Sequence, residues 1–195
     1  NGYWPTLFGL SHQRLDLVPQ MAADFPSELK QEGDFWVSSL PLKEGVLWSD
    51  GSEITAEDVV YTSQVVMDFD FSGNWTYAEG DLDHIEALDP YTVKLYYINK
   101  PGLAVHQYGV LQDPIVQKAY WEPLLAEAYQ KLDELGDMDE ESDEYIAGLS
   151  EAQQIIYGIP ADGEPVFGPF AFEKWEVGAF VENTANSSHF FNGIC

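Results

Sequence analysis

The segment Asp68–Glu79 has side chains of the types and spacing that bind calcium in an EF-hand loop. Its oxygen-bearing side chains at loop positions 1, 3, 5, 9 and 12 are Asp68, Asp70, Ser72, Thr76 and Glu79. Gly73 stands at position 6, where such a loop turns sharply. Against this interpretation, Phe71 and Trp75 are bulkier than usual for such a loop, and Gly80-Asp81 starts no second helix. A calcium-binding module is therefore one function that the residues leave open.

Carboxylates are abundant, with 34 acidic residues, so a pair of glycosidase type stays possible on number alone. No nucleophile elbow, zinc triad or phosphate-binding loop accompanies them. The four histidines have no metal-ligand spacing; they are His12, His84, His106 and His189. We expect no catalytic residue, no cofactor and, outside the calcium alternative, no metal ligand. A carboxylate-dependent hydrolase is the weaker alternative.

The composition excludes several classes of protein. Only 8 basic residues oppose the 34 acidic ones, so the formal net charge is -26. Such a field repels nucleic-acid phosphates and disfavours docking on an anionic membrane through a basic patch. Hydrophobic residues make up 45% of the chain, enough to build a core. The single cysteine, Cys195, can form no disulfide within the chain.

Local patterns predict a mixed α/β chain without the strand–helix–strand alternation of a doubly wound sheet. The predicted strands are Asp34–Leu42, Val46–Trp48, His84–Leu88, Thr92–Ile98, Ala171–Trp175 and Ala179–Asn183. Between them, Thr55 and Asp58 form the capping pattern of a helix that runs to Met67, with Ser49-Asp50-Gly51 as the preceding turn. The other predicted helical segments are Pro19–Ala22, Ile115–Leu135 and Glu140–Tyr157; in the second, Pro123 marks either a kink or a fresh start at a first helical position.

The stretch Leu40–Met67 closely resembles the hallmark of the family 5 extracellular solute-binding proteins, the receptors of ABC importers for oligopeptides, nickel chelates and some sugars. It contains Trp48-Ser49-Asp50-Gly51 followed by Thr55-Ala56 and Asp58-Val59, in a strand–turn–capped-helix context. Three further stretches resemble other sequence motifs of the family and occur in the same order along the chain; they are Pro19–Ala22, Leu88–Val93 and Gly168–Trp175. The four-residue Trp48–Gly51 motif is interpreted as structural, because its residues suit a strand end and a turn.

The resemblance implies a periplasmic-binding-protein-like fold of type II, of which residues 1–195 form one partial domain. Residues 1–165 would be the smaller subdomain of the N-terminal lobe, and residues 166–195 the strands that return toward the main lobe. The loop Ser72–Tyr77 would face the ligand cleft, so Trp75 and Tyr77 are the candidate ligand-binding residues. The alternative is that both fold onto the core. Trp36, Trp121 and Trp175 are expected in the core.

The resemblance also implies the function and the partners. The chain would belong to a monomeric extracytoplasmic receptor, lipid-anchored in its full-length form. This receptor captures a peptide or related small solute by lobe closure and delivers it to an ABC permease in the membrane. Nucleic acid is not an expected partner. Because half of the implied cleft would lie beyond this chain, we expect the chain alone to bind short peptides weakly or not at all.

Overall fold

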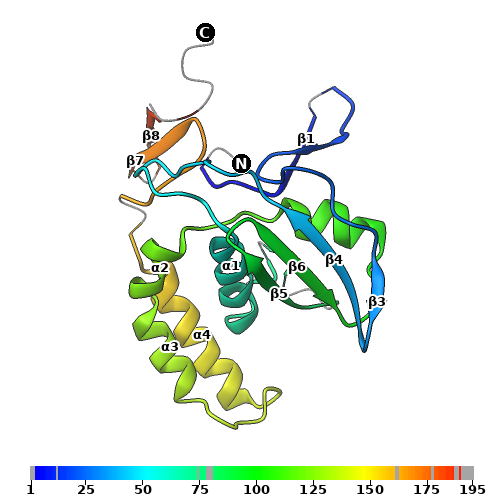
Figure 1. Ribbon diagram of the computed structural model, residues 1–195. Coiled ribbons are helices and arrows are strands. Elements are labelled where there is room, and N and C mark those ends of the chain that lie inside the picture. Colours follow the sequence, from blue (N-terminus) through cyan, green and yellow to red (C-terminus); the bar gives the residue numbers. More distant parts are fainter. Residues whose placement is uncertain are drawn as a thin grey trace.

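The computed structural model describes residues 3–11, 13–73, 75–77, 81–160, 163–176, 178–186 and 189 (Figure 1). The strands are β1 (Phe8–Leu10), β2 (Leu17–Pro19), β3 (Lys30–Glu32), β4 (Phe35–Pro41), β5 (Leu82–Asp89), β6 (Thr92–Tyr97), β7 (Phe170–Glu176) and β8 (Phe180–Ala185). The helices are α1 (Ala56–Asp68), the π-helix η1 (Ala104–Gly109), the 3-10 turn η2 (Val110–Gln112), α2 (Lys118–Leu124), α3 (Ala126–Asp133) and α4 (Asp143–Tyr157). Within the described residues, none of these helices is long and apolar enough to cross a membrane.

A four-stranded antiparallel sheet in the order β3-β4-β6-β5 forms the centre of the molecule. Strand β6 shows why one face of the sheet is covered: Val93, Leu95 and Tyr97 are fully buried, whereas the alternating Lys94 and Tyr96 are less buried. Helix α1 lies against β5 and β6 and buries its apolar side there (Figure 1). The two predicted strands of the β5–β6 hairpin and the long strand β4 are confirmed.

Helix α1 begins as the capping pattern predicts. The Asp58 carboxylate accepts a hydrogen bond from the backbone N–H of Thr55 at 3.0 Å, which completes the capping box. Ile54, just before the cap, and Val59 are both in the buried core, as expected for a hydrophobic staple. Glu57 and Asp58 place negative charge in the first turn, where the helix dipole favours it.

The same Asp58 carboxylate holds a second helix. Its Oδ1 accepts from the backbone N–H of Lys118 at 2.9 Å, the first residue of α2, and Oδ2 accepts from the indole of the fully buried Trp48 at 3.4 Å. The side chain is 6% exposed, and burial raises the pKa of Asp58, against the lowering effect of its three donors. One carboxylate therefore links the strand end at Trp48 to the starts of α1 and α2.

The second helical region is split into two helices, as Pro123 predicts. Helix α2 contains Pro123, and the chain leaves regular helix at Leu125 before α3 begins. Helix α4 starts at Asp143, where the Ser142 hydroxyl accepts from the backbone N–H of Tyr145 at 3.2 Å, and packs against α3 (Figure 1).

Two expectations about local structure are wrong, and one helix was not predicted. Pro19–Ala22 makes no helical turn, because Pro19 ends β2 and Ala22 forms an isolated bridge with Leu42. Val46–Trp48 is no strand, and a single bridge joins Leu47 to Glu53. The π-helix η1 has no counterpart among the predicted elements.

The C-terminal strands β7 and β8 form a separate two-stranded ribbon, at the positions that the sequence predicts. Trp175 is 63% exposed on this ribbon, so its expected place in the core is wrong. Phe170, Phe180 and Val181 are exposed on it as well.

Replacing Asp58 by alanine should destabilise the fold by about 2–4 kcal/mol, because two backbone N–H groups and a buried indole lose their acceptor. The matched control is Glu57→Ala at the next position. Glu57 forms an ion pair with Lys118 at 2.9 Å, but its side chain is 60% exposed, so about 0–1 kcal/mol is expected. Urea denaturation of both variants measures the two changes; equal effects would contradict the role given to Asp58.

Candidate functional site

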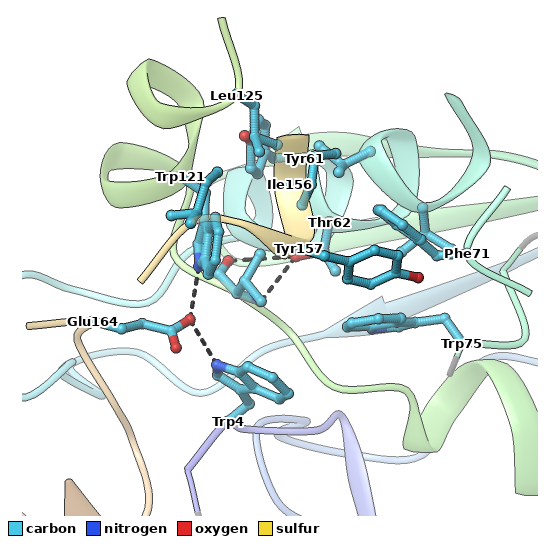
Figure 2. Close-up of a pocket in the computed structure, with 14 residues that line it drawn as sticks. Trp4, Tyr61, Thr62, Phe71, Trp75, Trp121, Leu125, Ile156, Tyr157 and Glu164 are labelled. Atoms are coloured by element: carbon cyan, nitrogen blue, oxygen red, sulfur yellow. Dashed lines mark hydrogen bonds between the residues drawn. The ribbon is translucent and has the colours of Figure 1, made fainter. Parts of the chain in front are cut away.

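A mostly apolar pocket of about 320 Å³ lies between α1, the loop that follows it, and the ends of α2 and α4 (Figure 2). The part of its wall that the structure describes includes six aromatic residues and one carboxylate: Trp4, Tyr61, Phe71, Trp75, Trp121, Tyr157 and Glu164. Aliphatic side chains of Val65, Val66, Val116 and Ile156 complete most of the remaining surface. Pockets that hold small ligands commonly have this composition, with apolar walls and few polar groups.

Segments far apart in the sequence supply the aromatic rings. Phe71 and Trp75 follow α1, and their ring centroids are 6.3 Å apart. The ring of Tyr157, the last residue of α4, lies 5.7 Å from that of Phe71, and Trp4 lies 6.2 Å from Trp75. Tyr157 is 61% exposed, whereas Phe71 is 8% exposed, so the pocket deepens from Tyr157 toward Phe71.

Among the described residues of the pocket wall, Glu164 alone has a carboxylate. Its Oε1 accepts hydrogen bonds from the indole nitrogens of Trp4 at 2.8 Å and Trp121 at 2.7 Å, and Figure 2 shows the carboxylate between these two side chains. Burial raises the pKa of Glu164, and the two indole donors oppose that rise. The carboxylate thus connects the N-terminal segment, α2 and the loop before β7 at one edge of the pocket.

Two hydroxyl groups of α1 also reach the pocket wall. Thr62 has its hydroxyl engaged, since it donates to the Asp58 carbonyl at 2.7 Å and accepts from the Val116 N–H at 3.0 Å. Tyr61 is 7% exposed, and its buried hydroxyl has no hydrogen-bond partner among the described residues. Burial raises the pKa of Tyr61, with the charge of Glu122 adding to the rise, so the phenol stays neutral.

The structure separates the two candidate ligand residues. Trp75 lines the pocket, and its indole N–H donates to the Pro114 carbonyl at 2.7 Å, which fixes the ring. Tyr77 is fully buried and borders a different cavity, beside Asp68 and Leu149. The buried Asp113 carboxylate holds this loop, with hydrogen bonds from the backbone N–H groups of Thr76 at 2.8 Å and Tyr77 at 3.1 Å. Ligand contact by either residue stays a prediction.

The structure describes part of the suggested calcium-binding loop Asp68–Glu79. Asp68 is the last residue of α1 and accepts from the Tyr129 hydroxyl at 2.9 Å. The Thr76 hydroxyl donates to Asp113 at 2.7 Å. Glu79, the twelfth position, lies outside the described residues. Within the described part of the chain, no group of three or more acidic, histidine or cysteine side chains is arranged to hold a metal ion. Calcium binding stays a prediction.

Sequence patterns did not single out the residues at the polar edge of the pocket. Glu164 stands in a Pro/Gly-containing loop with no periodicity, and Trp4 precedes the first predicted element. Trp121 follows a helical pattern and was expected in the core; it packs partly buried against the core and lines the pocket.

The raised pKa of Glu164 gives a testable dependence of stability on pH. An acid whose pKa is raised by folding stabilises the folded state below its unfolded pKa, and this contribution is lost as pH rises through the folded pKa. Glu164→Gln keeps an oxygen acceptor for both indoles but removes the charge. Its free energy of unfolding should therefore increase relative to wild type as pH rises from 4.5, the ordinary glutamate value, toward neutrality. Urea denaturation across this range measures the difference, and a constant difference would contradict the burial of a charge here.

Solved structures with the same fold are found over nearly the whole chain. NikZ from Campylobacter jejuni, in complex with Ni(L-His), has a TM-score of 0.62 at 20% identity, covering 97% of this chain and 31% of its own. The oligopeptide-binding protein AppA from Bacillus subtilis, with a nonapeptide, has a TM-score of 0.62 at 22% identity, covering 97% and 32%. An oligopeptide-binding protein from Thermus thermophilus, with a pentapeptide, reaches 0.66 at 16% identity, covering 96% and 32%.

This chain therefore spans about a third of the length of these structures and has the fold of that part of a type II periplasmic binding protein. No curated protein matches it. The profile of the family described as "Bacterial extracellular solute-binding proteins, family 5 Middle" matches residues 16–191. Because that match covers most of the sequence, the chain belongs to family 5 of the bacterial extracellular solute-binding proteins.

Proposed function

We propose that the protein is the extracytoplasmic substrate-binding component of an ABC importer, and that it captures an oligopeptide or a related small solute for delivery to a membrane permease. The observation that carries this proposal is the family match over residues 16–191. The solved relatives named above are in complex with a nonapeptide, a pentapeptide and a nickel–histidine complex, which supports a small solute as the ligand.

We place this chain in the N-terminal lobe of the full receptor, with residues 1–165 as its smaller subdomain and residues 166–195 as strands returning to the main lobe. The protein would act as a monomer. Affinity would come from closure of two lobes over the solute, since a ligand that contacts both lobes favours the closed state.

The aromatic pocket is the part of the site that this chain contributes. Its rings offer flat apolar area that loses little conformational entropy on binding. Trp75 is held in place by its bond to the Pro114 carbonyl, so it can contact a solute without further ordering. The pocket has no nucleophile and base in hydrogen-bond contact among its described lining residues, an arrangement that fits binding better than turnover.

Disruption of the gene should abolish uptake of one class of isotope-labelled short peptides or related solutes, and a plasmid copy should restore it. Trp75→Ala in that copy should weaken uptake at low solute concentration by about fivefold or more, the effect of losing one buried aromatic contact. Tyr108→Ala, at an exposed ring of η1 outside the pocket and outside the strands proposed to return to the main lobe, is the control and should leave uptake unchanged. Unaltered uptake of every solute after disruption would contradict the importer function.

Titration of the 195-residue chain alone with short peptides should give dissociation constants weaker than about 1 mM, because the second wall of the cleft would be missing. Isothermal calorimetry measures this directly. Micromolar binding of a short peptide would show that this part of the fold is a sufficient peptide site, contrary to the lobe-closure proposal.

A further inference from the structure

The side chain of Glu164 is half-buried in the pocket wall, without a positively charged neighbour among the described residues that line it. Neither lysine, arginine nor histidine is among the described residues that line the pocket. Lys118, at the start of α2, forms an ion pair with Glu57 at 2.9 Å. Both hydrogen-bond donors to Glu164 are neutral indoles that meet Oε1, and no donor in the described part of the chain meets Oε2. A half-buried carboxylate with one oxygen open to the pocket and no counter-charge favours a cationic partner.

The rest of the wall attracts the same kind of group. Phe71, Trp75 and Tyr157 lie on the other side of the pocket from the carboxylate in Figure 2. Aromatic rings carry negative potential on their faces, so a cation beside several of them is stabilised, and more strongly where water is excluded. A carboxylate edge and aromatic walls together complement a group that is both positively charged and apolar on its surface.

Hydrogen-bonding capacity decides which cation fits. A primary ammonium has three N–H donors, and each needs an acceptor once it is removed from water. Besides Glu164, the described wall has three hydroxyl groups: that of Thr62, which is already engaged, that of Tyr61, which is buried without a partner in the described structure, and that of Tyr157, whose side chain is 61% exposed at the pocket edge. A hard metal ion would need many oxygen ligands. An ammonium whose nitrogen carries alkyl groups needs few acceptors or none.

We propose that this pocket binds an alkylated ammonium group, with the aromatic rings around its methyl or alkyl groups and the Glu164 carboxylate as its counter-charge. This rests on the proposed function, because it names the chemical group of the captured solute that this pocket receives. The pocket of about 320 Å³ holds such a head group together with part of the chain attached to it.

The test compares choline with 3,3-dimethylbutan-1-ol, which has the same shape but a carbon atom in place of the charged nitrogen. Each is titrated into the 195-residue chain at pH 8, with tryptophan fluorescence as the measurement, because Trp4, Trp75 and Trp121 line the pocket. Choline should bind roughly tenfold more tightly than the neutral compound, in the range of a desolvated cation–π contact with an opposite charge nearby. Choline affinity should also fall as pH is lowered and Glu164 takes up a proton.

Glu164→Gln should lower choline affinity several-fold toward that of the neutral compound, with the aromatic contribution retained, while Glu57→Gln, at an exposed acid of α1, should leave it unchanged. Thermal unfolding of each variant establishes that it is folded. The comparison of the two ligands on the unsubstituted chain needs no variant, so it decides the proposal even where Glu164→Gln fails to fold.

Equal affinities for the two compounds, or no binding of either, would overturn the proposal. Neither result bears on uptake of peptides, which the gene disruption tests separately. Conversely, tight choline binding with unaltered uptake of every solute would retain the cation pocket and reject the importer function.

Discussion

The buried carboxylate of Asp58 is the interaction on which most of the architecture depends. It closes the capping box of α1, accepts the first backbone N–H of α2, and bonds the indole of Trp48. The nearby turn adds a second link, since Asp50 accepts from the Gln117 side chain at 2.9 Å just before α2. Because α2 carries Trp121 to the pocket, the Trp48–Gly51 motif and Asp58 shape the site without lining it.

The pocket is a product of tertiary packing of separate segments. Its rings come from the N-terminal segment, from α1 and the following loop, from α2, and from the end of α4. Glu164 connects two of these segments through the indoles of Trp4 and Trp121. Stability and binding are therefore coupled here: the same carboxylate that holds the segments together is costly to bury, and a cation would offset that cost.

Local chemistry decided which features could be predicted from the sequence. The capped helix α1, the β5–β6 hairpin and the break near Pro123 follow from side chains that act within a few residues, and they were predicted. Pro19–Ala22 was misassigned because its pairing partner, Leu42, lies far along the chain. The π-helix η1 has no side-chain signature. Trp75 was a candidate ligand residue because its loop resembles the family's cleft-facing loop. No sequence pattern marks Glu164, because its role depends on hydrogen bonds to two tryptophans that are distant in the sequence.

The exposed ribbon of β7 and β8 has a consequence for how these molecules behave toward one another. Phe170, Trp175 and Phe180 present apolar area on strands that could extend a sheet with another chain. The formal net charge of -26 opposes such an encounter through mutual repulsion. That repulsion acts over about 10 Å at 0.1 M salt and about 3 Å at 1 M. In solutions of this 195-residue chain by itself, where no main lobe covers the ribbon, ionic strength therefore sets the balance, with dispersion in dilute salt and attraction through the ribbon in strong brine.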